Sequence, residues 1–141
     1  MSSAAQPIST LEKNKQLLLR WFDEVWNQGR RETIFELFPD GILHDGSTRL
    51  SGPEPFCSFY DALHAQFSDF QFRPVISLAE GDLVCLHWSV AFRHTASGKT
   101  LNVTGTTIVR VENGVFAEAW QNWDAASLGA QLSDQPSARL W

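Results

Sequence analysis

Four segments in the second half of the chain constrain the fold most, because each has the length and the residue types of a β-strand. They are rich in Val, Ile, Phe, Thr and Trp, and turn sequences that contain glycine separate them. The segments are 70–78, 83–94, 101–111 and 115–123. Strands joined by such short turns pair antiparallel, so this half of the chain is predicted to form one antiparallel sheet.

The first half of the chain has helical signals instead. Ser9 and Glu12 form a capping-box pattern at the start of a helix that is expected to run to about Gln28 and to end at Gly29. Further elements are expected at 31–38 (helix), at 42–46 (short strand), from Pro53 onward (helix) and from Asp124 onward (helix). Helices followed by a run of strands predict an α+β fold, in which helices cover one face of a curved, mostly antiparallel sheet.

The chain has the size of a single domain, which is expected to span residues 9–133 between tails at 1–8 and 134–141. The net charge is −5 and the basic residues are scattered, which argues against a nucleic-acid-binding surface. No apolar segment approaches the roughly 20 residues of a membrane span, and the first residues do not resemble a secretory signal. The expected location is therefore cytoplasmic, and Cys57 and Cys85 are expected to be buried thiols rather than a disulfide.

Alternation along the strands predicts which side chains face the core. In segment 83–94 one face carries the apolar set, which is Val84, Leu86, Trp88, Val90 and Phe92. In the next segment Gly105 and Thr107 belong to the core-facing set. A three-residue loop at 112–114 would place Ala119 opposite Thr107 and Gln121 opposite Gly105, so Gln121 is predicted to face the core.

A glutamine on the core face needs hydrogen-bond partners, so Gln121 indicates either a satisfied internal network or a ligand site. The sequence favours neither alternative. Gly105, which has no side chain, is predicted to leave space for a ligand beside Gln121. The two acids that flank Gln121 receive structural roles, since Glu118 is expected on the outer face of the sheet and Asp124 as a helix N-cap.

The sequence contains no nucleotide-binding loop, nucleophile elbow or metal-binding motif. The four histidines lack the spacing of metal ligands, so no metal is expected. His44 is the most interesting of them, because it ends an apolar run and an imidazole of ordinary pKa can act as a base near neutral pH. A histidine that is hydrogen-bonded in a loop is the alternative interpretation of the same residue.

Several short motifs occur in order along residues 10–132. They are the segments 25–29 (VWNQG), 97–99 (SGK) and 108–114 (IVRVENG), the isolated His44, and the residues Glu118, Trp120, Asp124, Gln131 and Leu132. With these motifs the chain resembles the SnoaL-like polyketide cyclase family of the nuclear transport factor 2-like superfamily. The resemblance implies a cone-shaped curved sheet whose N-terminal helices enclose an apolar cavity. It also implies a homodimer formed through the outer face of the sheet.

The resemblance carries an expectation about chemistry as well. In cyclases of this family, an acid just after the strand tryptophan acts as general acid and base in a cofactor-free aldol ring closure, with polar support from the adjoining strand. By resemblance, the acid position falls on Gln121, the support positions on Gly105 and Thr107, and a further polar position on His44. A carboxamide does not accept a proton near pH 7, so proton transfer would have to move to His44 or to another group.

Two functions are therefore considered. The first is a cofactor-free enzyme, cyclase-like or isomerase-like, that acts on an apolar carbonyl or cyclic substrate, with His44 as the base and with Gln121 and Thr107 as orienting groups. The substrate would contact Tyr60, Trp88, Phe92, Trp123 and the space at Gly105. The second is a non-catalytic protein that binds a small apolar ligand in the same cavity. Either protein is expected to be a homodimer that binds a small apolar molecule and neither nucleic acid nor membrane.

Overall fold

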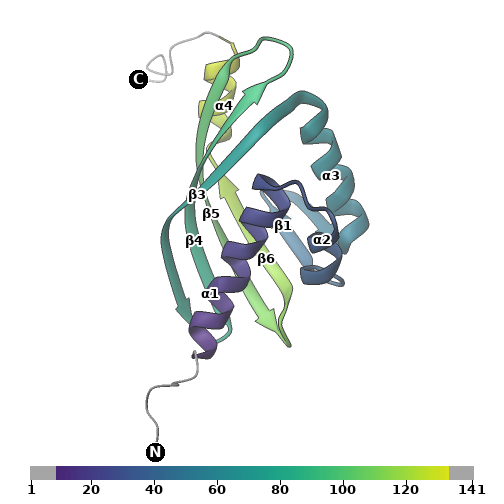
Figure 1. Ribbon diagram of the computed structural model, residues 1–141, viewed down its shortest axis with the longest axis vertical. Coiled ribbons are helices and arrows are strands. Elements are labelled where there is room, and N and C mark those ends of the chain that lie inside the picture. The colour runs from purple at the N-terminus through teal and green to yellow at the C-terminus, as the bar shows by residue number, and fades with distance from the viewer. Residues whose placement is uncertain (1–8, 134–141) are drawn as a thin grey trace, which may run out of the picture.

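The structure, a computed structural model, describes residues 9–133, which form a curved six-stranded sheet with helices packed against it (Figure 1). The helices are α1 (Thr10–Trp21), the π-helix η1 (Phe22–Asn27), α2 (Glu32–Leu37), α3 (Pro53–Gln66) and α4 (Ala125–Leu132). The strands are β1 (Ile42–Asp45), β2 (Thr48–Ser51), β3 (Phe67–Glu80), β4 (Leu83–His94), β5 (Thr100–Glu112) and β6 (Val115–Trp123). The tails expected at 1–8 and 134–141 lie outside the described residues.

The strands lie in the order β2-β1-β6-β5-β4-β3. Neighbouring strands pair antiparallel, except that β1 and β6 are parallel. In Figure 1, α1 crosses the strands on one side of the sheet, and α4 lies at the far end, where it contacts β5. The predicted α+β fold with a curved, mostly antiparallel sheet is confirmed.

The two largest departures from the expected elements are in β2 and β3. β3 begins at Phe67 rather than at residue 70, because Asp69, with a φ of 58°, interrupts the pairing with β4 without ending the strand. Pro74 is tolerated in β3 because β3 is an edge strand. β2 was not predicted, since its four residues are mostly exposed and their strand conformation depends on pairing with β1.

The first helix begins and ends where the capping signals predict. The Ser9 hydroxyl accepts a hydrogen bond from the Glu12 N–H at 3.1 Å, and Gly29 has a φ of 71° after the last turn. The π-helical turn η1 was not predicted. At its end the Asn27 amide forms two hydrogen bonds with the Phe72 backbone, of 3.1 and 2.7 Å. These bonds tie η1 to the edge strand β3.

The side of the sheet that was predicted to be buried is buried, and we call it the inner face. All five members of the apolar set in β4 belong to the core. Thr107 and Ala119 are also buried on this face. Glu118 lies on the opposite side, the outer face, as predicted, and Ile108 lies there as well.

The turn between β5 and β6 differs from the expected three-residue loop. It contains two residues, Asn113 and Gly114, which both have positive φ, 51° and 77°. A two-residue turn with this backbone suits the twist of a hairpin. By itself such a turn would point Gln121 to the outer face, because it changes the register of β6 on β5 by one residue relative to the three-residue loop.

A β-bulge in β6 brings Gln121 back to the inner face. The bulge lies between the pairs Val111–Phe116 and Arg110–Glu118, so one residue of β6 has no partner in β5. Gln121 therefore lies on the inner face as predicted, but it pairs with Thr107 and not with Gly105. The residue opposite Gly105 is Trp123.

No helix within residues 9–133 is long and apolar enough to cross a membrane. Both cysteines are free, as expected. Cys57 is buried, whereas Cys85 is half-buried and pairs with Ile108 on the outer face. The expectation that both thiols are buried is therefore correct for Cys57 only.

Candidate active site

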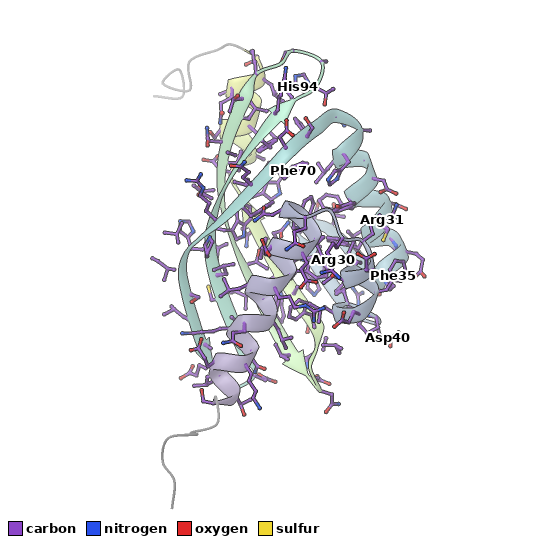
Figure 2. All side chains as sticks on the ribbon, viewed as in Figure 1. Arg30, Arg31, Phe35, Asp40, Phe70 and His94 are labelled. Carbon is purple, nitrogen blue, oxygen red and sulfur yellow. The ribbon has the colours of Figure 1, made fainter. Side chains whose placement is uncertain are left out.

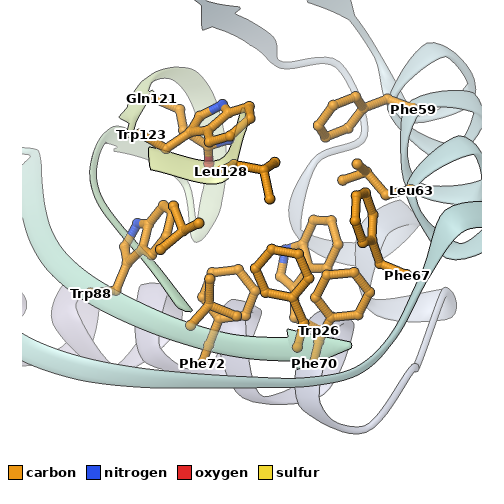
Figure 3. Close-up of a pocket in the computed structure, with 13 residues that line it drawn as sticks. Trp26, Phe59, Leu63, Phe67, Phe70, Phe72, Trp88, Gln121, Trp123 and Leu128 are labelled. Atoms are coloured by element: carbon orange, nitrogen blue, oxygen red, sulfur yellow. The ribbon is translucent and has the colours of Figure 1, made fainter. Parts of the chain in front are cut away.

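A cavity lies between the inner face of the sheet and the helices η1, α3 and α4 (Figure 3). The free space inside it is about 90 Å³, which is below the roughly 300–1,000 Å³ typical of small-molecule sites. Its walls are mainly aromatic and aliphatic, and Figure 3 shows rings from several elements facing the same space. They include Trp26, Phe59, Phe67, Phe70 and Phe72.

Gln121 brings an amide to this apolar lining. Its Oε1 accepts a hydrogen bond from the Thr107 hydroxyl at 3.3 Å, and the Thr107 hydroxyl accepts one from the Trp88 indole N–H at 2.9 Å. Gln121 therefore belongs to an internal network, which is one of the two alternatives that the sequence left open, and it also lines a cavity, where a ligand site stays a prediction. No side-chain N or O atom buried among residues 9–133 lacks a hydrogen-bond partner.

Asp45 completes this polar group. β1 lies beside β6 in parallel, which pairs Asp45 with Gln121. The Gln121 Nε2 donates a hydrogen bond to the Asp45 Oδ2 at 3.4 Å, and the Trp123 side chain donates a second one. Asp45 is half-buried and forms no ion pair with the residues that the structure describes.

Burial raises the pKa of the Asp45 carboxyl above its ordinary value, and the hydrogen bonds from Gln121 and Trp123 offset part of the increase. A carboxyl group with a raised pKa is a stronger base when ionised and a usable acid closer to neutral pH. Acids of this kind beside an apolar pocket are candidates for catalysis. Asp45 does not itself line the cavity, and it is connected to the lining through its hydrogen bonds with Gln121 and Trp123.

Asp45 was not predicted from the sequence, because the neighbouring His44 was assigned the role of the base. Alternation in β1 contained the relevant signal, since Asp45 shares a face with the apolar Leu43 and His44 does not. The parallel pairing of β1 with β6, which places Asp45 beside Gln121, is a long-range contact that no local pattern reveals.

His44 lies on the outer face and not in the cavity, which corrects the placement expected from the sequence. Its Nε2 is 2.7 Å from the Glu118 Oε2, and its ring stacks on Trp120 with centroids 5.7 Å apart. The hydrogen bond from His44, followed by that from Arg110, lowers the pKa of Glu118. The histidine belongs to a surface network, because odd and even positions of β1 point to opposite faces.

The remaining predicted contact residues divide into two groups. Trp88, Phe92 and Trp123 line the cavity, and Thr107 supports Gln121. Tyr60 is buried outside the lining, where its hydroxyl donates to the Val25 carbonyl at 2.8 Å.

Gly105 does not leave the open space that the sequence suggested. A Cβ atom at this position would lie 2.3 Å from the Trp88 ring and 2.8 Å from the Asn122 carbonyl oxygen. The glycine is required because the Trp88 indole lies directly over the backbone of β5.

Gly105→Ala is therefore expected to destabilise the protein by about 1–3 kcal/mol, because the buried Trp88 ring has to move. Urea unfolding followed by circular dichroism measures this change. Gly129→Ala in α4 is the matched control, since a Cβ there meets nothing within 4 Å and is expected to leave stability unchanged or raise it. Equal stabilities of the Gly105→Ala variant and the wild type would contradict the close packing of Trp88 on Gly105.

Among residues 9–133 no group of three or more His, Cys, Asp or Glu side chains is placed to hold a metal ion. His94 lies at the end of β4 near the hairpin (Figure 2), where its Nδ1 is 2.7 Å from the Ser97 hydroxyl. His64 is within hydrogen-bond distance of the Tyr60 carbonyl, at 2.9 Å. The titratable side chain hydrogen-bonded to the cavity lining is thus Asp45.

The fold and the site define a small α+β domain in which a curved sheet and helices surround an apolar cavity with a carboxyl and an amide beside it. The chain belongs to the SnoaL-like polyketide cyclase family, whose model matches residues 16–132. The resemblance found in the sequence is thereby confirmed. No protein of curated function matches the chain.

Solved structures agree on the fold. A protein from Jannaschia sp. CCS1 assigned as a SnoaL-like polyketide cyclase superposes with a TM-score of 0.81 at 22% identity, covering 94% of this chain and 100% of the other. AclR from Streptomyces galilaeus, assigned as a hydroxylase, superposes with a TM-score of 0.80 at 20% identity, covering 90% of this chain and 100% of the other. IdmH from Streptomyces antibioticus, assigned as a polyketide cyclase, superposes with a TM-score of 0.78 at 22% identity, covering 85% of this chain and 98% of the other. At these identities the likeness supports a shared fold, and the differing assignments leave the reaction to the site itself.

Proposed function

We propose that this protein is an enzyme that removes a proton from the carbon next to the carbonyl group of a small apolar cyclic molecule. Asp45 is the base, and no cofactor takes part. One observation carries the proposal: a carboxyl group with a pKa raised by burial is hydrogen-bonded to the amide that lines an apolar cavity. Membership of a family of polyketide cyclases is consistent with this chemistry.

The proposed step needs only groups that the chain supplies. The Asp45 carboxylate takes the proton from carbon, the C–H electron pair forms a carbon–carbon double bond, and the carbonyl π electrons move to oxygen to give an enolate. The protonated Asp45 then returns its proton to the same carbon or to another one. Alternatively, the enolate carbon attacks a second carbonyl group of the same molecule and closes a ring, and the protonated Asp45 gives its proton to the alkoxide oxygen that forms. Aromatic walls favour flat rings.

Exchange of hydrogen for deuterium tests the proposal without knowledge of the natural substrate. In D₂O, 2-tetralone loses its α-protons to solvent, and NMR measures the rate with and without the protein. We expect catalysed exchange above the buffer rate that saturates with ketone concentration. If 2-tetralone and other bicyclic ketones bind but exchange at the buffer rate, the enzyme proposal is wrong.

The alternative, a non-catalytic binding protein, is favoured by one observation. Gln121 occupies the position at which the related cyclases are expected to carry their acid, and an amide does not transfer protons. Such a protein would bind the same apolar ligands in the same cavity and release them unchanged. Binding of bicyclic ketones without any exchange would support this second function.

We further propose that the outer face is the contact between two copies of the chain. Leu78, Cys85, Ile108 and Trp120 form one row across four neighbouring strands. Leu78 is 63% exposed and Ile108 is 37% exposed. Beyond Trp120 the row continues with His44, which pairs with Glu118, and with Arg49 on β2. The apolar part of the row, from Leu78 to Trp120, is the surface that would lie against a second copy.

Ile108→Glu is expected to weaken self-association by about tenfold or more, because it buries a charge without a partner in the contact. Light scattering at micromolar concentrations measures the effect. Phe35→Glu on α2 is the matched control, since Phe35 is 47% exposed on a helix away from the outer face (Figure 2). A wild-type protein that is monomeric at these concentrations would refute the dimer.

A further inference from the structure

Three hydrogen bonds connect Trp88, Thr107, Gln121 and Asp45 into one chain across the inner face. The Trp88 indole N–H donates to the Thr107 hydroxyl at 2.9 Å, and the Thr107 hydroxyl donates to the Gln121 Oε1 at 3.3 Å. The Gln121 Nε2 donates to the Asp45 Oδ2 at 3.4 Å. Each strand from β4 to β6, and then β1, contributes one member of this chain.

The chain has a fixed direction because its first member can only donate. An indole N–H has no acceptor atom, so the Thr107 hydroxyl must accept from Trp88 and has its single proton left for Gln121. The amide oxygen of Gln121 therefore faces Thr107, and its NH₂ group faces Asp45. Thr107 is 4% exposed, so water does not compete for its hydroxyl.

The opposite orientation of the amide would be unfavourable. It would place the Gln121 oxygen against an ionised Asp45, so that two acceptors would face each other, and it would leave the Thr107 proton without the acceptor that it has now. The orientation thus follows from the partners at both ends of the amide.

One of the two N–H groups of Gln121 is committed to Asp45, and Gln121 lines the cavity. We propose that Trp88 and Thr107 are positioning residues that hold the Gln121 amide with its second N–H available to the cavity, so that the site selects ligands with a hydrogen-bond acceptor over ligands with only a donor. This inference deepens the proposed function, because the acceptor of a substrate would be the carbonyl oxygen on which charge develops.

Three bicyclic ligands of similar size test the selection. 2-Indanone has only an acceptor, indole has only a donor, and indane has neither. We expect the wild type to bind 2-indanone about tenfold more tightly than indane, which is the effect of one hydrogen bond in an apolar site, and to bind indole no more tightly than indane. Calorimetry or ligand-observed NMR gives the dissociation constants.

Substitutions of Thr107 and Trp88 test the positioning. Thr107→Val removes the hydroxyl and Trp88→Phe removes the indole N–H, so both variants are expected to bring the ratio of the 2-indanone and indane affinities close to one. Thr107→Ser keeps the hydroxyl and is expected to keep the wild-type ratio. Because the ratio is internal to each variant, a general loss of affinity does not alter its interpretation.

Two results would overturn the inference. One is a wild-type protein with no preference for 2-indanone over indane, and the other is a Thr107→Val variant that retains the full preference. Neither result depends on proton transfer. If the proposed reaction fails, 2-tetralone does not exchange, yet the preference for an acceptor and its dependence on Thr107 would still be observed.

Discussion

Asp45→Asn is expected to lower the rate of catalysed α-proton exchange on 2-tetralone by about 10²–10⁴-fold, the usual contribution of a general base. The substitution keeps the size of the side chain and its ability to accept the hydrogen bonds from Gln121 and Trp123. It replaces one carboxylate oxygen with an NH₂ group, so the side chain no longer takes a proton. Deuterium exchange followed by NMR at saturating ketone gives the rate.

His44→Ala is the control for this experiment, because His44 lies on the outer face and contacts Glu118 and Trp120 instead of the cavity. We expect its exchange rate to equal that of the wild type. Loss of exchange in His44→Ala together with normal exchange in Asp45→Asn would reverse the assignment and favour the histidine that the sequence suggested.

The stability of Asp45→Asn separates loss of chemistry from loss of fold. The pKa of Asp45 is higher in the folded protein than in the unfolded chain, so the stability that its protonated form contributes is present below the unfolded pKa and is lost as the pH rises through the folded pKa. At pH 7 the ionised carboxylate opposes folding. The variant is therefore expected to be at least as stable as the wild type at pH 7 in urea unfolding.

Trp88→Ala is expected to destabilise the protein by about 3–5 kcal/mol, as is usual when a buried tryptophan is truncated. Trp88 is 4% exposed, lies over Gly105 and packs edge-on against Phe72 with ring centroids 5.0 Å apart. Its removal also leaves Thr107 without the indole donor. Urea unfolding at pH 7 followed by far-UV circular dichroism measures the change in the free energy of unfolding.

Trp123→Ala is the matched control for Trp88→Ala. Trp123 also lines the cavity, but its residue is 37% exposed, so less apolar surface returns to water when its ring is removed. We expect its loss of stability to be no more than about half of that for Trp88→Ala. Equal losses for the two variants would show that Trp88 is not a central element of the core.

The sequence predicts the fold well because the fold depends on local patterns. Strict alternation in β4 identifies all five of its buried residues, and the caps at Ser9 and Asp124 form the predicted bonds. The facing of Gln121 was also predicted correctly, although the reason differs. The expected longer turn is absent, and a bulge in β6 shifts the register by one residue in the opposite direction, which gives the same facing but a different partner for Gln121.

The candidate site was predicted only in part, because it is assembled from strands that are distant in the sequence. Gln121, Thr107 and Trp88 lie on strands joined by hairpins, so their common face follows from alternation. Asp45 joins them through the parallel pairing of β1 with β6, which depends on tertiary packing. A prediction from residues 42–46 alone therefore named His44 as the base, but the side chain of His44 lies on the outer face.

The pH dependence of exchange, measured together with the titration of Asp45, tests whether Asp45 is the base. NMR of the carboxyl carbon gives the Asp45 midpoint, and the exchange rate on 2-tetralone is recorded over the same pH range. We expect that both midpoints coincide, that they lie above the ordinary aspartate pKa of about 3.9, and that the rate profile disappears in Asp45→Asn. An Asp45 midpoint at the ordinary value, or a rate profile that persists without Asp45, would contradict this role of Asp45.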